Sequence, residues 1–537
     1  MPKRKAVPLL QRLCLENIAE NMHLLWTKDY TDNYLDEYQF RYILGPFSEL
    51  AGSLVQELLK LMGEKRRLTR AGLHLLVVPQ LMELNLSACS RLVNKTITQM
   101  ITVRCKNLSS LNLQGCSRIP ADVLVDLVER LTCLKKLDLS ETQCNTQVLS
   151  AVGSCCRQLC ELDISDCKKL SPESLLHLAY DPTVGSYCCP ALQLLWVDGL
   201  CPTAHSQDLC WILAFLLLAL PSLRSLENEF VPEALCLLQK QQFNRAPVTP
   251  GFPSLEEVAQ GRMATCADKA RSWLTLPLRE MIEVHEEALP VVSAMCPDLE
   301  KVTVNLEEDG PFPSRSFLLW RHLTHLTLES AEVRALREFF PVVASLGSQL
   351  QALSLEGFSA DDELAFHTLL GHCPNLRSLT ASLLYTVRPR RGAEEAPSRA
   401  VSLAALAFPD LCEFSLILSD LHDGLPFRQA GTLRASLVSL LRNAPCLEYL
   451  HLVDVPFCLD EVFEAVLEPR GAALARLRDL SLHQCKVSSR TIHLLLSSEN
   501  LLSSLHLERC PDIHRKDYDK LLRRVSKEGF ELQVHWK

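Results

Sequence analysis

One short leucine pattern recurs through most of the chain, and this recurrence limits the possible folds more than any other feature. The frame LxxLxL returns every 25–27 residues in its most regular stretch. There it occupies Leu81/Leu84/Leu86, Leu108/Leu111/Leu113, Leu134/Leu137/Leu139 and Leu159/Leu162/Ile164. A fixed period of this length predicts an array of similar supersecondary units rather than several unrelated domains.

Looser copies of the frame continue toward the C-terminus and bring the total to about fifteen units. They lie at Leu192/Leu195/Val197, Leu223/Leu226, Leu255/Val258, Leu299/Val302/Val304, Leu323/Leu326/Leu328, Leu350/Leu353/Leu355, Leu376/Leu379, Leu411/Phe414/Leu416, Leu447/Leu450/Leu452, Leu477/Leu480/Leu482 and Leu502/Leu505/Leu507. The copy at Leu255/Val258 is faint. The segment Phe530–Lys537 reads as a final strand that closes the last repeat.

Each unit reads as a strand, a turn and a helix. The alternation in LxL predicts a strand with one buried face, and the stretch that follows, such as Ala121–Leu131, has helical spacing. Such a unit cannot bury its leucines alone, so neighbouring units must stack into one continuous core. The sequence therefore predicts an α/β leucine-rich-repeat solenoid over residues 76–537, a horseshoe with strands on its concave side, preceded by a helical region over residues 1–75.

Charge and hydropathy exclude several classes of partner. The net charge of −9 opposes binding to nucleic acid, which requires a basic face. The longest apolar run, Trp211–Leu220, is about half the length of a membrane span and predicts a buried helix. Arg12 and Glu16 interrupt the first apolar run, unlike a signal peptide, so we expect a cytoplasmic or nuclear protein with no membrane partner. The basic Pro2–Lys5 is either a nuclear import signal or a solvated tail.

Many of the 23 cysteines recur in phase with the leucines. Several units extend the frame to LxxLxLxxC, at Cys89, Cys116, Cys167, Cys485 and Cys510. Another cysteine, such as Cys105, often precedes the first leucine. Metal binding is one interpretation, but recurrence in phase favours small core side chains beneath each turn. The pattern resembles the cysteine-containing leucine-rich repeats of F-box proteins over Leu81–Cys167 and Leu477–Cys510.

The motifs of common catalytic sites are absent from the sequence. There is no GxxxxGK[ST], GxSxG or HExxH, and the segment Val284–Leu289 lacks the second histidine of a zinc helix. We therefore expect no enzyme, no cofactor and no metal. A third, weaker hypothesis keeps open an enzyme or a zinc site at His483, His506 and Glu508, on adjacent strands.

Strand phase predicts which side chains line the concave face, because the residues beside the leucines of LxL point away from the core. The early repeats present an acidic group, and the later ones present histidines and aromatics. The predicted substrate-binding residues are Glu83, Asp138, Glu161, Asp163, Trp196, Tyr449, His451, His483 and His506. Mixed polar and aromatic surfaces of this kind suit binding to protein.

The helix predicted over Leu9–Met22 carries the sharpest functional motif. Leu10, Cys14 and Ile18 are spaced i, i+4, i+8 and share a stripe with Leu13. The stretch resembles the elongin-C-binding box of ubiquitin-ligase substrate receptors, with Leu9 where that box has a small residue or proline. The resemblance implies that Leu10 enters a pocket on elongin C, that Cys14 allows close approach, and that elongin B accompanies elongin C.

A second segment, Leu44–Met62, places Pro46 before spaced leucines that include Leu50 and Leu54. It resembles the cullin box of cullin-2-type receptors, with Leu50 one residue late. A degenerate F-box is an alternative interpretation. Adaptor helices followed by leucine-rich repeats are the arrangement of the PRAME-like and Zyg-like receptor families, although the armadillo-like region of Zyg-like proteins is missing.

These observations support two main hypotheses. In the first, the chain is a non-catalytic substrate receptor that binds elongin B and elongin C, a cullin, and a protein substrate. In the second, it is a scaffold or inhibitor, and the first helices only cap the open end of the solenoid. The segments 243–254, 306–316 and 385–402 are predicted surface insertions, rich in Pro, Gly, Ser or charge.

Overall fold

The computed structural model describes most of the chain. The described residues are 2, 9–28, 45–200, 206–241, 243, 249–265, 274–307, 310–360, 364–384, 403–419, 427–467 and 473–537. The predicted insertion 385–402 therefore lies outside them. From Leu9 onward the described residues form two compact units that divide after Ile282. We call them the N-terminal unit and the C-terminal unit.

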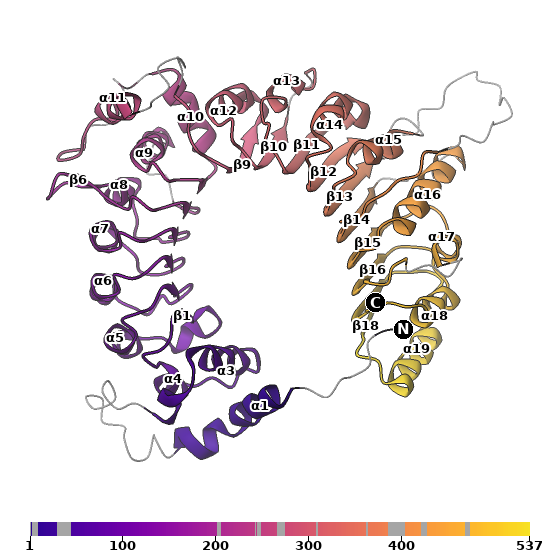
Figure 1. Cartoon of the computed structure of the whole chain (residues 1–537), viewed down its shortest axis with the longest axis horizontal. Coiled ribbons are helices and arrows are strands. Elements are labelled where there is room, and N and C mark those ends of the chain that lie inside the picture. Colours follow the sequence, from indigo (N-terminus) through magenta and orange to yellow (C-terminus); the bar gives the residue numbers. More distant parts are fainter. Residues whose placement is uncertain are drawn as a thin grey trace. The chain divides into compact units, whose positions relative to one another are not determined.

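The N-terminal unit begins with helices that precede the first repeat (Figure 1). They are α1 (Leu10–Met22), the π-helical turn η1 (His23–Thr27), the 3₁₀ turn η3 (Pro46–Glu49), α3 (Gly52–Glu64) and α4 (Arg70–Leu76). The segment Leu44–Met62 contains η3 and most of α3, and the extended backbone of Leu50 separates these two elements. Thr69 caps α4 by accepting a hydrogen bond from the Gly72 amide.

The repeats of the N-terminal unit form a parallel sheet covered by helices. Its strands follow chain order and are β1 (Glu83–Asn85), β2 (Ser110–Asn112), β3 (Lys136–Asp138), β4 (Glu161–Asp163), β7 (Leu194–Trp196) and β8 (Ser225–Glu227). The helical elements are η4 (Ser87–Leu92), α5 (Lys95–Arg104), α6 (Ala121–Arg130), α7 (Thr146–Cys155), η5 (Pro172–Leu175), α8 (Leu176–Ala179), α9 (Ser206–Ala219), α10 (Val231–Gln239) and α11 (Leu255–Thr265). A hairpin of β5 (Tyr180–Asp181) and β6 (Ser186–Tyr187) follows α8.

The C-terminal unit repeats the same plan with longer strands. They are β10 (Lys301–Leu306), β11 (His325–Ala335), β12 (Ala352–Ser359), β13 (Ser378–Leu384), β14 (Glu413–Ser419), β15 (Tyr449–Val453), β16 (Asp479–His483), β17 (Ser504–Glu508) and β18 (Gln533–Trp536), parallel and in chain order. The helical elements are η7 (Glu286–Ala288), α12 (Leu289–Met295), α13 (Ser314–Phe317), η8 (Leu336–Phe339), α14 (Phe340–Leu346), α15 (Ala365–His372), α16 (Phe427–Arg442), α17 (Leu459–Leu467), α18 (Ser489–Ser497) and α19 (Arg515–Glu528). The predicted final strand is confirmed, since β18 pairs with β17.

The leucine frame forms the core of each unit. Leu111, Leu137 and Leu162 lie in register on neighbouring strands and are almost completely buried. The residues beside them in LxL point to the opposite side of the sheet, which we call the strand face. The predicted α/β leucine-rich-repeat solenoid is therefore confirmed, with one strand and at least one helical segment in most repeats.

One predicted repeat is wrong. Leu255 and Val258 belong to helix α11, because their i, i+3 spacing fits a helix as well as the first part of the leucine frame. The next strand is instead β9 (Glu280–His285), whose buried residues are Met281 and Val284. Glu283 between them has a φ of +54°, and the two buried residues are three positions apart, so the sequence lacks the alternation that identifies a strand.

The apolar run at Trp211–Leu220 is buried, as predicted, at the end of the 14-residue helix α9 and just after it. No helix in the described part of the chain combines the length and the apolar character needed to cross a membrane.

The in-phase cysteines link consecutive repeats. After the strands, the Cys167 thiol donates to the Leu139 carbonyl at 3.1 Å and the Cys485 thiol to the Leu452 carbonyl at 3.4 Å. Before the strands, the Cys105 thiol donates to the Val78 carbonyl at 3.4 Å. Each bond joins a thiol to the preceding repeat, and all described cysteines are free. This geometry supports the structural interpretation of the cysteines.

We predict that Leu137→Ala lowers the free energy of unfolding by about 2–5 kcal/mol, since it leaves a cavity between stacked repeats. Urea denaturation followed by circular dichroism measures the loss, and hydrogen exchange should show it concentrated in β2, β3 and β4. Met82→Ala, at a position 53% exposed, is the matched control and should change stability little. An equal loss in both variants would contradict the stacked-core account.

Two glycines in the left-handed region give a second prediction. Gly357 has a φ of +80° and a Cβ there would collide with the Ser330 carbonyl oxygen, whereas Gly529 has a φ of +65° and open space around it. Gly529→Ala should therefore cost only the backbone strain, about 1–2 kcal/mol, and Gly357→Ala about 1–3 kcal/mol more. Urea denaturation of both variants checks the order, and similar losses would show that the collision is relieved without cost.

Candidate functional site

Helix α1 has two apolar faces. One face packs inward, where Leu15, Ala19 and Met22 are each 2–4% exposed. The predicted adaptor-binding residues lie on the other side of the helix, where Leu10 is 76% exposed and Cys14 is also exposed. Ile18 is half-buried between the two faces. The structure therefore leaves Leu10 and Cys14 accessible while α1 is held to the protein through different residues.

Polar bonds and one aromatic contact hold this first segment in place. Gln11 donates to the Glu57 carboxylate at 3.3 Å, and the ammonium group of Lys65 lies 3.4 Å from the Glu20 carboxylate. Helix α3 and its C-cap therefore contact α1 near the two ends of α1. Trp26 packs edge-on against Phe47, with ring centroids 5.5 Å apart. These contacts fix the orientation of α1, and hence which of its faces is exposed.

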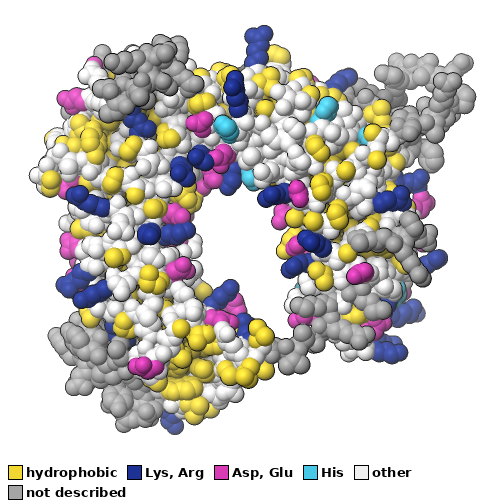
Figure 2. Space-filling model, viewed as in Figure 1, with side chains coloured by type: hydrophobic (Ala, Val, Ile, Leu, Met, Phe, Trp, Pro, Cys, Tyr) yellow, Lys and Arg dark blue, Asp and Glu magenta, His cyan; other side chains and the backbone are white. Residues whose placement is uncertain are grey.

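The accessible apolar surface extends beyond the predicted motif. Five leucines in this region are 41–80% exposed, and we call them the leucine ridge. They are Leu9 at the N-cap of α1, Leu10 and Leu13 in α1, and Leu24 and Leu25 in η1. Five of the 15 exposed large apolar side chains in the described residues thus fall within 17 positions of sequence. Figure 2 shows hydrophobic side chains gathered over the region of α1 and α3. Exposed apolar groups concentrated in this way mark interaction surfaces.

Sequence reasoning missed Leu24 and Leu25, which follow α1 in the segment HLLWT. This segment forms a π-helical turn, in which residues no longer keep the 100° spacing of an α-helix. The only available signal was the adjacent pair of leucines at the end of the amphipathic stretch.

The residues of the second predicted box lie on two elements. Pro46 is exposed at the start of η3, while Leu50 and Leu54 are half-buried, in the link to α3 and within α3. Leu58, further along α3, is fully buried. The structure therefore leaves the first part of this segment partly accessible and uses its second part in the core.

The strand face of the N-terminal unit carries the predicted acidic group in two register rows. Glu83 and Glu161 lie in one row, and Glu161 pairs with Lys136 at 2.8 Å. Asp138, Asp163 and Trp196 lie in the other row. All five predicted residues are exposed or half-buried.

Asp138 and Asp163 also shape the turns that follow their strands. The Asp138 carboxylate accepts hydrogen bonds from the Ser140 amide at 3.0 Å and from the Asn112 side chain at 2.6 Å. Asp163 accepts one from the Ser165 amide at 2.9 Å, and its burial raises the pKa of this carboxyl. Both residues form Asx turns. Their recurrence in the sequence is therefore explained by turn geometry as well as by any role in binding.

The strand face of the C-terminal unit carries the predicted tyrosine and histidines. Tyr449 is 47% exposed. His451 and His506 are half-buried and lie in the same register row, with Ser481 between them. His506 stacks on His535 with centroids 4.5 Å apart. His483 lies in a neighbouring row beside Glu508.

The weaker hypothesis of a metal site gains no support from this arrangement. Among the described residues, no three His, Cys, Asp or Glu side chains are grouped in a way that would hold a metal ion. Burial, with a smaller effect of His483, lowers the pKa of His451.

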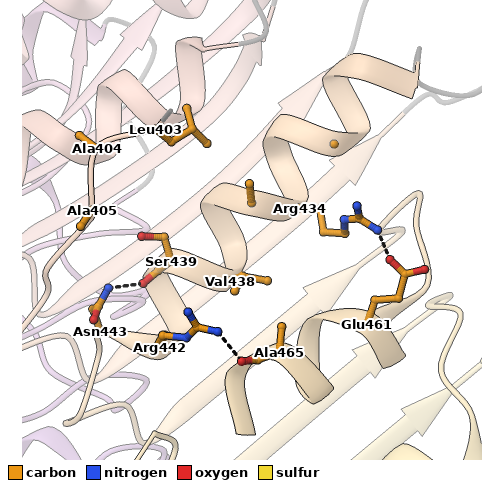
Figure 3. Close-up of a pocket in the computed structure, with 12 residues that line it drawn as sticks. Leu403, Ala404, Ala405, Arg434, Val438, Ser439, Arg442, Asn443, Glu461 and Ala465 are labelled. Carbon is orange, nitrogen blue, oxygen red and sulfur yellow. Dashed lines mark hydrogen bonds and ion pairs between the residues drawn. The ribbon is translucent and has the colours of Figure 1, made fainter. Parts of the chain in front are cut away.

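A pocket of about 550 Å³ lies on the helical side of the C-terminal unit (Figure 3). It is bounded by α16, α17 and the segment Leu403–Ala405, and many of its lining side chains are small. The Arg434 side chain pairs with Glu461, and Arg442 donates to the Ala465 carbonyl at 2.6 Å. The described residues that line the pocket include neither cysteine nor histidine, and among them no pair of side chains is suited to proton transfer or nucleophilic attack.

Comparison with known proteins places the chain near leucine-rich-repeat proteins. No family model matches it. It is 28% identical over 248 residues to the F-box/LRR-repeat protein 4 of Bos taurus, a match that covers 41% of this chain and only 37% of that protein.

Solved structures with similar backbones share little sequence with the chain. A crystal structure of the yeast Rad7 and Elc1 complex has 17% identity, with 89% of this chain and 94% of that chain covered and a TM-score of 0.47. An LRR protein of Leptospira interrogans has 14% identity, covers 87% and 92% of the two chains, and gives a TM-score of 0.36.

We predict that acid loosens the helical region that carries the leucine ridge, because α4 contains His74. Burial, together with the nearby charge of Arg104, lowers the pKa of His74 to about 4, below its ordinary value of 6.5. Between these pH values the unfolded chain binds the proton more readily, so stability falls as the pH drops from about 6.5 toward 4. At pH 5 this histidine should account for a loss of about 1–2 kcal/mol.

The measurement is urea denaturation at pH 7.5 and pH 5 for the wild type and for His74→Gln, which cannot take up the proton. The variant should lose less stability than the wild type over this interval. His372→Gln, in the C-terminal unit, serves as the control. Equal losses in the wild type and in His74→Gln would contradict the assignment.

Proposed function

We propose that this protein is a non-catalytic substrate receptor, which binds an elongin C–elongin B adaptor and a cullin through its N-terminal helices and a protein substrate through its strand faces. The observation that carries the proposal is the exposure of Leu10 and Cys14 on a helix whose opposite side is anchored. A helix that served only as a cap would gain nothing from exposed leucines, which cost free energy in water.

The exposed surface matches what a helix-binding partner requires. Leu10 and Cys14 are one helical turn apart and are accessible from the same side, and Leu13 extends the apolar area beside them. A partner that binds an apolar helix face in a groove contacts residues spaced i, i+3 and i+4, as these three residues are. The resemblance of the segment to the elongin-C-binding box identifies elongin C as the partner to test.

The cullin would contact the segment around Pro46, Leu50 and Leu54. Pro46 is exposed and the two leucines are half-buried, so part of this surface is accessible. The sequence similarity to an F-box/LRR-repeat protein supports a second candidate, in which the same helices bind an F-box-type adaptor. Both candidates share the receptor role and differ in the adaptor.

The test is co-purification of the full chain with elongin B–elongin C. Leu10→Ser combined with Cys14→Phe should reduce binding at least tenfold, since it removes an apolar anchor and blocks close approach. Leu319→Ser, which removes a leucine 52% exposed in the C-terminal unit, is the matched control and should bind normally. Circular dichroism verifies that all variants are folded.

Loss of binding in the folded double variant alone would support the elongin adaptor. If the wild type does not bind elongin B–elongin C, that adaptor is excluded, and the F-box-type adaptor or the scaffold hypothesis takes its place. If the wild type and the double variant bind equally, the α1 surface is not the binding site. If the complex with elongin B–elongin C forms, cullin-2 is added to it. The variants Leu50→Asp and Leu54→Asp should then reduce binding of the cullin in the same co-purification assay.

A further inference from the structure

The strand face of the C-terminal unit presents an open aromatic ring at Tyr449. Tyr449 is 47% exposed and begins β15, in the middle of the series β14, β15 and β16 (Figure 1). Among the described strand residues of this unit, Val333 is the other large apolar side chain with comparable exposure, and it lies on β11. An aromatic side chain that remains open to solvent on a regular strand is available to a partner.

Tyr449 lies between two carboxylates in its register row. Glu413 of β14 is its partner on one side and Asp479 of β16 on the other. Neighbouring strands are about 4.8 Å apart, so the two acidic positions are separated by about 10 Å, with the ring between them. Ser378 donates to the Glu413 carboxylate at 3.1 Å and restrains its orientation.

The rest of this strand face is mainly acidic. The outward positions that pair in register on β10–β18 carry five carboxylates and one lysine, namely Glu329, Glu356, Glu413, Asp479 and Glu508, with Lys301. The row beside Tyr449 consists largely of Ser, Thr and His, and Ser415 and His451 are hydrogen-bonded at 3.2 Å. The lowered pKa of His451 keeps this neighbour uncharged near pH 7.

The cation closest in sequence to this site is already engaged. Arg478 directly precedes Asp479, and its guanidinium lies 3.1 Å from the Glu448 carboxylate. Glu413 and Asp479 differ from Glu448 in lying on the strand face itself, in one register row with Tyr449. Their charges are therefore directed toward whatever approaches the strand face.

We propose that Glu413, Tyr449 and Asp479 bind an arginine-bearing segment of the substrate protein, an inference that rests on the receptor function proposed above and adds the chemical class of the substrate. A guanidinium stacks on the face of a tyrosine ring and donates in its own plane to carboxylates. Lysine lacks this planar geometry. In a polyproline II segment, two arginines three residues apart point to the same side and are about 9 Å apart, which is close to the spacing of Glu413 and Asp479.

The experiment measures fluorescence anisotropy of a fluorescein-labelled glycine–serine peptide that carries two arginines three residues apart, with the full-length chain at low ionic strength. The same peptide with lysines, and with glutamates, provides the comparison. Tyr449→Leu keeps an apolar side chain but removes the aromatic face, and it should weaken binding of the arginine peptide about two- to fivefold. Glu413→Gln combined with Asp479→Asn should weaken it about threefold or more.

The control variants change a tyrosine and two carboxylates elsewhere on the protein surface. Tyr187→Leu alters a tyrosine that is 55% exposed on the β5–β6 hairpin, and Asp122→Asn with Glu129→Gln removes two exposed carboxylates from α6. Both controls should bind the arginine peptide like the wild type. Circular dichroism shows whether every variant is folded.

Several results would overturn the proposal: no binding of the arginine peptide at millimolar concentration, equally tight binding of the glutamate peptide, or equal weakening by the controls. A lysine peptide that binds as well as the arginine peptide would overturn the stacking geometry. The outcome is independent of the adaptor, because the assay contains no elongin. The double variant Leu10→Ser/Cys14→Phe should retain peptide binding even if it loses the adaptor.

Discussion

The structure depends on one constraint: no repeat can remove its leucines from water by itself. Each of the strands β2, β3 and β4 buries a leucine because a similar strand lies in register on either side of it. Hydrogen bonds also join neighbouring repeats. The thiols of Cys167 and Cys105, for example, each donate to a backbone carbonyl of the preceding repeat. Because stabilisation comes from neighbours, the ends of such an array need other residues to cover them, and α3 and β18 are the elements found there.

This constraint also explains why the two sides of the sheet differ so much in sequence. The side of the sheet that faces the helices carries leucine or another apolar residue at nearly every repeat, whereas the strand face is not covered by any helix of the same repeats in the described part of the chain. Its composition is therefore free to vary, and it does, from the acidic rows near β3 and β4 to the rows of hydroxyl and histidine side chains near β15 and β17. Some positions of the strand face are nevertheless constrained by the turns that follow the strands, since Asp138 and Asp163 accept hydrogen bonds from backbone amides there.

The repeat period made most of the fold predictable from the sequence, because a strand with alternating leucines leaves a signal at every turn of the solenoid. The prediction failed where that signal was broken. Helix α11 was mistaken for a repeat, and β9 was missed because its two buried residues are three positions apart. For the candidate site, helical spacing identified Leu10 and Cys14, but the burial of Leu15 on the opposite face depends on contacts with α3 that no local pattern reveals.

The burial of the cysteines has a practical consequence for chemistry at the leucine ridge. Packing under the turns raises the pKa of Cys105 and of Cys485 to about 12, so these thiols remain protonated and shielded. Of the 21 described cysteines, only Cys14 and Cys133 are exposed. A thiol-directed probe would therefore distinguish surface from core among the described cysteines, and one of the two exposed ones, Cys14, lies next to Leu13 of the leucine ridge. The molecule thus contains a natural attachment point for a reporter at the surface where a partner would bind.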